Sequence, residues 1–267
     1  MTTDIIINGG LGKMGREIAA CVLDDSEIRL AGSIEHPGHP LMGKDYGECI
    51  GRGALRIPVV DSLAGLSLEK SVIIDFSSPQ ATLALVDACL EKKARVVICT
   101  TGIDAAGIEK IKAAAKSIPV VFSPNFSLGV NLLFVLTELA ARKLGSAFDI
   151  EIIEAHHRYK KDSPSGTAVK LGEIAASAMG TTYHDAVRNG RAGMVGARSN
   201  REIGMHAVRG GDIVGDHTVL FAGLGERLEL RHVATSRSTF AHGAVSAAKW
   251  LSTQKPGLYT MRDVLGF

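Results

Sequence analysis

The first half of the chain alternates short, wholly apolar runs with segments of helical periodicity. Ile5-Ile6-Ile7 and Val72-Ile73-Ile74 are apolar at every position, which is typical of strands covered on both faces. Because connections between parallel strands are right-handed, these βαβ units predict a Rossmann-like, doubly wound parallel sheet that binds ligands at the carboxyl ends of its strands. The expected strands are 5–7, 28–34, 72–76, 95–99 and 120–122, and the expected helices are 13–23, 77–90 and 105–116.

The pattern changes after about residue 127. Short runs joined by glycine-rich turns, with no helix between the last three, predict a second α+β domain with a mostly antiparallel sheet. We therefore expect two domains with a cleft between them, one over 1–127 with the return of 239–267, and one over 128–238. The elements expected after residue 127 are helices 128–144, 167–179 and 240–251 and strands 148–154, 204–209, 217–222 and 227–234.

Composition excludes several classes of protein. Of the 267 residues 46% are hydrophobic and 22% are charged, which excludes a disordered or collagen-like chain. The formal net charge of +2 does not identify a nucleic-acid binder. No basic leader or long apolar stretch suggests secretion or membrane insertion. The four cysteines form no C-x-x-C pair, so we expect free thiols in a cytoplasmic protein; they are Cys21, Cys49, Cys89 and Cys99.

A glycine-rich segment, 9–15, lies between the first expected strand and helix. Both the Gly10-x-Gly12-x-x-Gly15 and the Gly9-x-x-Gly12-x-x-Gly15 spacing predict a tight turn there. Such a turn lets the backbone approach a pyrophosphate, whose charge the helix N-terminus attracts. The motif alone is weak, but Glu35 follows about twenty residues later, where a carboxylate accepts hydrogen bonds from ribose hydroxyls. Together they predict a dinucleotide site.

The same region bears on the choice of cofactor. Glu35 repels a 2′-phosphate, which favours NADH. His36 is either a partner for that phosphate when protonated or a solvated loop residue, so use of NADPH stays open. Two more strand ends, 99–102 and 123–127, supply small polar side chains suited to the nicotinamide and its ribose, with ordinary turn chemistry as the alternative.

The segment 154–167 follows a strand of the second domain and concentrates charge. Five cationic or protonatable side chains lie within 156–161, which alone is usual for a solvated face. Because Ser165-Gly166-Thr167 then opens a helix, its N–H groups and hydroxyls favour an anion, and the segment predicts a carboxylate site with a proton donor. Adjacent His156 and His157 diverge on an extended chain, and no third ligand has metal-site spacing, so no metal is expected.

These segments resemble the bacterial 4-hydroxy-tetrahydrodipicolinate (dihydrodipicolinate) reductases over nearly the whole chain. The most specific match is the run 154–168, E-A-H-H-R-Y-K-K-D-S-P-S-G-T-A, followed by R-G-G-D-I-V-G-D-H at 209–217. The resemblance implies NAD(P)H-dependent reduction of a cyclic dicarboxylate, 4-hydroxy-tetrahydrodipicolinate, to tetrahydrodipicolinate in diaminopimelate and lysine biosynthesis. It also implies that the first domain holds the cofactor, while the second binds substrate and forms a homotetramer through its sheet.

The resemblance also assigns site residues. His156 and Lys160 are the implied proton-transfer residues. The implied substrate-binding residues are His157, Lys160, Ser165, Gly166, Thr167 and Arg237. The implied cofactor-binding residues are Gly9, Gly10, Leu11, Gly12, Lys13, Met14, Glu35, Cys99, Thr100, Thr101, Ser123, Pro124, Asn125 and Phe126.

Three positions depart from the usual family pattern, namely Cys99, Ser123-Pro124 and His36, and the last leaves NADH against NADPH open. Two other functions would share the glycine-rich motif of the first domain. Another enzyme of the same architecture, such as an amino-acid dehydrogenase or a reductase-like desaturase, would need different residues in place of the cationic loop. An NADH-sensing regulator would need a basic DNA-binding segment, which the pattern lacks.

Overall fold

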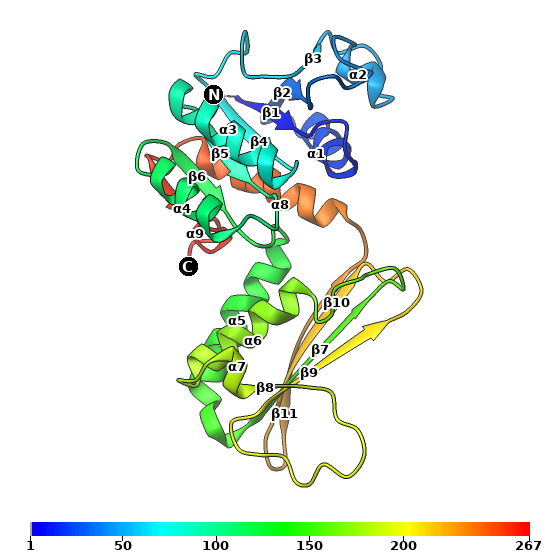
Figure 1. The fold of residues 1–267 in the computed structure, drawn as a ribbon, viewed down its shortest axis with the longest axis vertical. Coiled ribbons are helices and arrows are strands. Elements are labelled where there is room, and N and C mark those ends of the chain that lie inside the picture. The colour runs from blue at the N-terminus through cyan, green and yellow to red at the C-terminus, as the bar shows by residue number, and fades with distance from the viewer. Residues whose placement is uncertain (1) are drawn as a thin grey trace. The chain divides into compact units, whose positions relative to one another are not determined.

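The computed structural model describes residues 2–267, and for Ser146 the backbone only; Met1, the first residue of the predicted 1–127 domain, lies outside them. The chain forms two compact units (Figure 1). Unit 1 comprises the residues up to Leu128 together with Arg237–Phe267, and unit 2 comprises Gly129–Ser236. The binding roles expected of the two domains remain predictions. No helix within 2–267 is long and apolar enough to cross a membrane.

Unit 1 is built on a seven-stranded sheet with the order β12-β6-β5-β4-β1-β2-β3. Every pairing in it is parallel, and β1 lies between β2 and β4 at its centre. The strands are β1 (Thr3–Asn8), β2 (Ile28–Ile34), β3 (Val59–Val60), β4 (Ser71–Asp75), β5 (Arg95–Ile98), β6 (Pro119–Phe122) and β12 (Gly257–Tyr259).

Helices cover both faces of this sheet, which is why its strands are apolar at successive positions (Figure 1). Ile5 and Ile7 pack in one core with α1 and α8, whereas Ile6 packs in the other with α3 and α4. This arrangement confirms the Rossmann-like class. The helices of unit 1 are α1 (Lys13–Leu23), α2 (Tyr46–Cys49), α3 (Pro79–Lys92), α4 (Ala105–Ala114), α8 (Ser238–Leu251) and α9 (Met261–Val264).

Unit 2 packs helices against one face of a five-stranded sheet of order β11-β10-β7-β9-β8. Burial alternates along β10, so one face of the sheet lies in the core and the other is open. The strands are β7 (Asp149–His156), β8 (Val187–Asn189), β9 (Ile203–Arg209), β10 (Gly215–Ala222) and β11 (Arg227–Ala234). The helices are α5 (Leu128–Leu144), the 3₁₀ turn Gly145–Ala147, α6 (Gly166–Ala178) and α7 (Tyr183–Ala186).

The α+β class of unit 2 is confirmed, and its sheet is mixed. Strand β10 is antiparallel to β7 and β11, while β9 is parallel to β7 and β8. The sequence shows tight turns between β9 and β10 but not that β7 inserts between them. Six elements were not predicted, namely β3, β8, β12, α2, α7 and α9; each has two to four residues, too few to show a period.

Candidate active site

The glycine loop between β1 and α1 is pressed against its neighbours. Gly9 has a left-handed φ of +79°, and a Cβ on Gly10 would lie 2.2 Å from Ser33 Oγ. A Cβ on Gly15 would lie 2.2 Å from the Gly9 carbonyl oxygen. The buried Tyr46 hydroxyl donates a hydrogen bond to the Gly10 carbonyl at 2.8 Å. Only glycine fits these positions, and the loop is held rigidly.

The loop has the features of a pyrophosphate cradle. Gly12 is the N-cap of α1, and no side chain caps this helix among the described residues. Its first-turn N–H groups and helix dipole therefore suit an anion. Glu35, at the end of β2, accepts hydrogen bonds from the Leu11 N–H (3.2 Å) and the His36 N–H (3.0 Å). These bonds fix the carboxylate beside the loop, and the residues present fit a bound dinucleotide.

The ends of β1, β4 and β5 are joined by one buried carboxylate. Asp75 accepts hydrogen bonds from Asn8 Nδ2 at 2.7 Å and from Thr100 Oγ1 at 2.9 Å. Thr100 Oγ1 also accepts from the Ser77 N–H, so this hydroxyl is used within the protein. Cys99 is buried, and burial raises the pKa of its thiol well above the usual value. Any cofactor contact from Thr100 or Cys99 is therefore expected from backbone groups, while Thr101 is exposed.

The segment after β6 is ordered by its own hydrogen bonds and by α8. Ser123 Oγ donates to the Asn125 carbonyl at 3.1 Å, and the Ser127 N–H donates to Asn125 Oδ1 at 2.8 Å. A Cβ on Gly243 of α8 would lie 1.6 Å from the Phe126 carbonyl oxygen. Gly243 thus sets the position of a predicted cofactor segment, although nothing in the local sequence marks it.

In unit 2 the alternation along β7 places Glu154 and His156 on the buried face. Glu154 is fully buried and accepts four hydrogen bonds, a role that the sequence analysis did not predict. Arg209 Nη1 and Nη2 each donate at 2.8 Å, one to each carboxylate oxygen. His156 Nδ1 lies at 2.6 Å and the Ser165 N–H at 3.0 Å.

These contacts define the charge states of Glu154 and His156. Burial by itself raises the pKa of Glu154, but the hydrogen bonds from Arg209, His156 and Ser165 outweigh it, and the pKa lies below its usual value. Since Glu154 is ionised, His156 Nδ1 carries the shared hydrogen. Burial, assisted by the charges of Lys160 and Arg209, lowers the pKa of His156 despite Glu154. His156 is therefore neutral near pH 7, with the lone pair on Nε2.

The Lys160 loop follows directly. Lys160 Nζ pairs with Asp162 Oδ1 at 2.9 Å, and the side chain is only 21% exposed. The Lys160 N–H donates to the His157 carbonyl at 3.1 Å, which closes a turn. Arg209 Nη2 donates to the Asp162 carbonyl at 2.7 Å, so the loop is tied to β9 as well as to β7.

The start of α6 completes the cluster. Ser165 caps the helix through a hydrogen bond from the Ala168 N–H to its Oγ, at 3.2 Å. The same hydroxyl lies 3.0 Å from His217 Nε2. Burial lowers the pKa of His217 to about 3, so His217 is neutral and shares one hydrogen bond with the Ser165 hydroxyl. Gly166 is exposed at the helix start, where the dipole favours an anion.

The structure brings together His156, Lys160 and the start of α6; their role as one substrate site stays a prediction. Arg237 is exposed at the N-cap of α8 and belongs to unit 1. Sequence reasoning assigned no role to three further members of the cluster, Glu154, Arg209 and His217. Strand register brings them into the cluster, since His156 pairs with Arg209 and Glu154 with His217, and no local sequence pattern shows that register.

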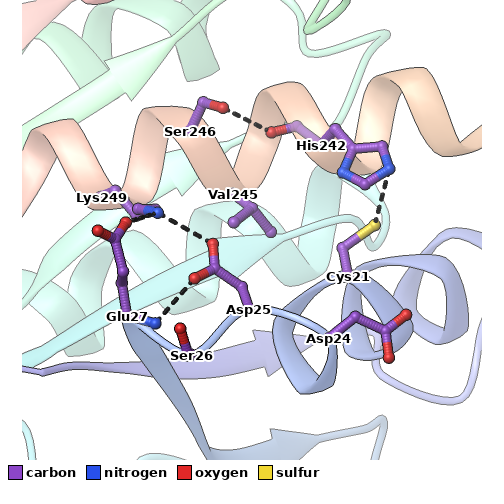
Figure 2. Close-up of a pocket in the computed structure, with 9 residues that line it drawn as sticks. All are labelled: Cys21, Asp24, Asp25, Ser26, Glu27, His242, Val245, Ser246 and Lys249. Carbon is purple, nitrogen blue, oxygen red and sulfur yellow. Dashed lines mark hydrogen bonds and ion pairs between the residues drawn. The ribbon is translucent and has the colours of Figure 1, made fainter.

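A hollow in unit 1, of about 660 Å³, is lined by the end of α1, the turn into β2, and α8 (Figure 2). It lies at the amino-end edge of the parallel sheet, opposite the glycine loop. Lys249 Nζ pairs there with Asp25 (2.9 Å) and Glu27, and Cys21 Sγ lies 3.8 Å from His242 Nε2. The Lys249 ion pairs join α8 to the turn before β2. Burial and nearby carboxylates raise the pKa of the Cys21 thiol, so this thiol is not activated.

Within residues 2–267, no group of three or more His, Cys, Asp or Glu side chains is arranged to hold a metal ion.

Two family profiles cover almost the whole chain. The family described as "Dihydrodipicolinate reductase, N-terminus" matches residues 3–126, and "Dihydrodipicolinate reductase, C-terminus" matches residues 129–265. A 4-hydroxy-tetrahydrodipicolinate reductase of Thiobacillus denitrificans is 49% identical over 266 residues, covering 100% of this chain and 99% of the relative. One of Methylococcus capsulatus is 47% identical over 260 residues, covering 97% of each.

Solved structures of two other proteins are also similar to this chain. A dipicolinate-bound dihydrodipicolinate reductase from Paenisporosarcina sp. TG-14 superposes with a TM-score of 0.77 at 25% identity, covering 97% of this chain and 98% of that one. A probable dehydrogenase from Thermotoga maritima has a TM-score of 0.60 at 13% identity, covering 98% and 92%, and shows likeness of fold alone.

Proposed function

Since this chain belongs to the dihydrodipicolinate reductase family, we propose that the Glu154–His156–Lys160 cluster is where it acts on its substrate. The chain is an NAD(P)H-dependent oxidoreductase that reduces 4-hydroxy-tetrahydrodipicolinate to tetrahydrodipicolinate in diaminopimelate and lysine biosynthesis. The observation that carries this function is the family match along both units, with 49% identity to a reductase over 266 residues.

The reaction sets the tasks of the residues. The substrate gains a hydride and loses its ring hydroxyl as water, so one proton is consumed along with the reduced nucleotide. NAD(P)H supplies the hydride when it is bound. The glycine loop would hold its pyrophosphate through the N-terminus of α1, and Glu35 would accept hydrogen bonds from its ribose hydroxyls. Backbone groups of 99–101 and 123–126 would meet the nicotinamide portion.

We assign proton donation to Lys160 and a proton-accepting or relaying role to His156. Lys160 is a cation on a partly buried loop, so it can stabilise negative charge on the substrate ring and supply a proton. His156 presents Nε2 as an acceptor, because its Nδ1 hydrogen is held by ionised Glu154. His157, Ser165, Gly166, Thr167 and Arg237 are the proposed carboxylate-binding residues, with the N-terminus of α6 supplying N–H groups.

The direct test is an assay with purified protein. NADH, then NADPH, is mixed with enzymatically generated 4-hydroxy-tetrahydrodipicolinate, and absorbance at the nicotinamide band is followed. We expect a loss of absorbance that needs protein, substrate and nucleotide together. An unchanged absorbance with both nucleotides, in protein whose circular dichroism shows it folded, would refute the function.

We also propose a preference for NADH, a homotetramer and a cytoplasmic location. Glu35 beside the loop supports NADH by repulsion of a 2′-phosphate, and the exposed His36 follows it directly in the chain. The open face of the second sheet supports assembly, since Ile153, Val208 and Val233 on it are 39%, 48% and 47% exposed. Four free cysteines are in keeping with a reducing compartment.

A further inference from the structure

Arg209, the last residue of β9, makes contacts that no other residue of the cluster makes. Its two Nη atoms donate to both oxygens of Glu154 at 2.8 Å, and Nη2 also donates to the Asp162 carbonyl at 2.7 Å. Glu154 in turn bonds His156, and Asp162 pairs with Lys160. The guanidinium therefore lies one residue away from each proposed proton-transfer group.

We propose that Arg209 is a positioning residue for the reductase reaction, holding His156 through Glu154 and the Lys160 loop through the Asp162 carbonyl. The inference rests on the proposed roles of His156 and Lys160. Only a planar fork can make these bonds at once, since an ammonium is a point donor that cannot bridge two carboxylate oxygens and a carbonyl in one plane.

The charge of Arg209 matters separately from its shape. Glu154 is fully buried, and an unpaired carboxylate there would draw a proton onto His156. With Arg209 in place the pair is neutral overall, and Arg209 itself lowers the pKa of His156. The titratable and charged groups that face His156 are Glu154 on the same strand, Lys160 on the loop, Arg209 on β9 and His217 on β10.

Two variants separate charge from shape. Arg209→Gln removes both, so we expect the pKa of His156, followed by NMR titration of its imidazole, to rise by on the order of one unit. The acidic limb of the kcat profile should move to higher pH with it, because neutral His156 is then lost earlier. Arg209→Lys keeps the positive charge but loses the planar pair of donors. The pKa of His156 should therefore stay near that of the unaltered protein, while KM for 4-hydroxy-tetrahydrodipicolinate rises about tenfold or more.

The matched control is Arg191→Gln. Arg191 makes a comparable fork on Glu151, three residues earlier on β7, with no contact to His156. We expect a loss of stability from this variant and an unchanged pKa of His156. A merely structural role for Arg209 would make its variants behave in the same way.

Two results would overturn the proposal. One is a pKa of His156 in Arg209→Gln that matches the unaltered protein; the other is Arg209→Lys with unchanged KM and kcat. If Arg209→Gln does not fold, Arg209→Lys decides alone. A protein inactive on 4-hydroxy-tetrahydrodipicolinate would refute the proposed function. The NMR titration needs no substrate, so it would still test the effect of Arg209 on His156.

Discussion

At the residue scale, a buried carboxylate determines what its neighbours can do. Glu154 is ionised because two guanidinium hydrogen bonds outweigh the cost of burial, and its charge keeps the His156 hydrogen on Nδ1. Asp75 has a similar effect in unit 1, where it accepts the hydrogen bond of the Thr100 hydroxyl. In both places a residue that sequence analysis passed over limits the chemistry of residues that it chose.

The proposed proton-transfer residues make the first residue-scale prediction. Lys160→Ala and His156→Ala should each lower kcat by about 10²–10⁴-fold, the usual cost of losing a positioned acid or base. NADH affinity should change little, because neither residue belongs to the unit that carries the glycine loop. Steady-state kinetics and a fluorescence titration of NADH measure the two effects. Near-normal kcat in both variants would contradict the assignment.

The second residue-scale prediction concerns Glu35. Replacement by Ala removes the proposed ribose acceptor and the charge proposed to repel a 2′-phosphate, so Kd should rise for NADH and rise less, or fall, for NADPH. Calorimetric titration with each nucleotide gives the ratio of the two Kd values. Glu48→Ala, which removes an exposed carboxylate on α2, is the control. A ratio that Glu35→Ala leaves unchanged would show that this residue does not contact the ribose.

At the element scale, the long connection 190–202 between β8 and β9 is held by charges. Glu151 on β7 accepts hydrogen bonds from Arg191, Arg198 and His206. Burial alone raises the pKa of Glu151, but these bonds outweigh it and bring the pKa to about 2. The ion pairs explain how an irregular segment can deliver β9 to its place beside β7.

This network predicts a pH-dependent stability. The folded pKa of Glu151 lies below its unfolded value, so its contribution is full above about pH 4.5 and is lost as the pH falls toward 2. Glu151→Gln should therefore lower the free energy of unfolding at pH 7 by on the order of 3 kcal/mol.

Urea unfolding followed by circular dichroism at pH 7, 4 and 2.5 would measure that loss. The gap between Glu151→Gln and the unaltered protein should close as the pH falls. Exposed Glu226→Gln serves as the control, with no difference at any pH. A gap that stays constant with pH would mean that the lost stability does not come from the charge of Glu151.

At the scale of the whole molecule, the open face of the second sheet makes a prediction about assembly. Val233→Glu places a charge on that face, so we expect the proposed tetramer to dissociate in sedimentation velocity experiments. Leu90→Glu, an equally exposed apolar position on α3 of unit 1, should leave the assembly unchanged. A tetramer that survives Val233→Glu, or a monomeric unaltered protein, would contradict assembly through this face.

Much of the fold could be predicted because periodicity reports burial. Helices α1 and α5 and strands β2 and β11 begin and end where the pattern places them, since their apolar positions repeat at the period of the element. The glycine loop was predictable for a related reason: only glycine tolerates a turn this close to its neighbours, so the composition records the geometry.

Contacts between distant segments were decided by the tertiary structure alone. No local pattern shows that β7 inserts between β9 and β10, and that insertion sets Arg209 beside His156, a residue 53 positions earlier in the sequence. The sequence also did not show that the Thr100 hydroxyl donates a hydrogen bond to Asp75, or that the absence of a side chain at Gly243 lets the Phe126 carbonyl approach α8. Local sequence encodes which way a side chain faces within its element, whereas the partner it meets depends on strand order and register, which only the folded chain establishes.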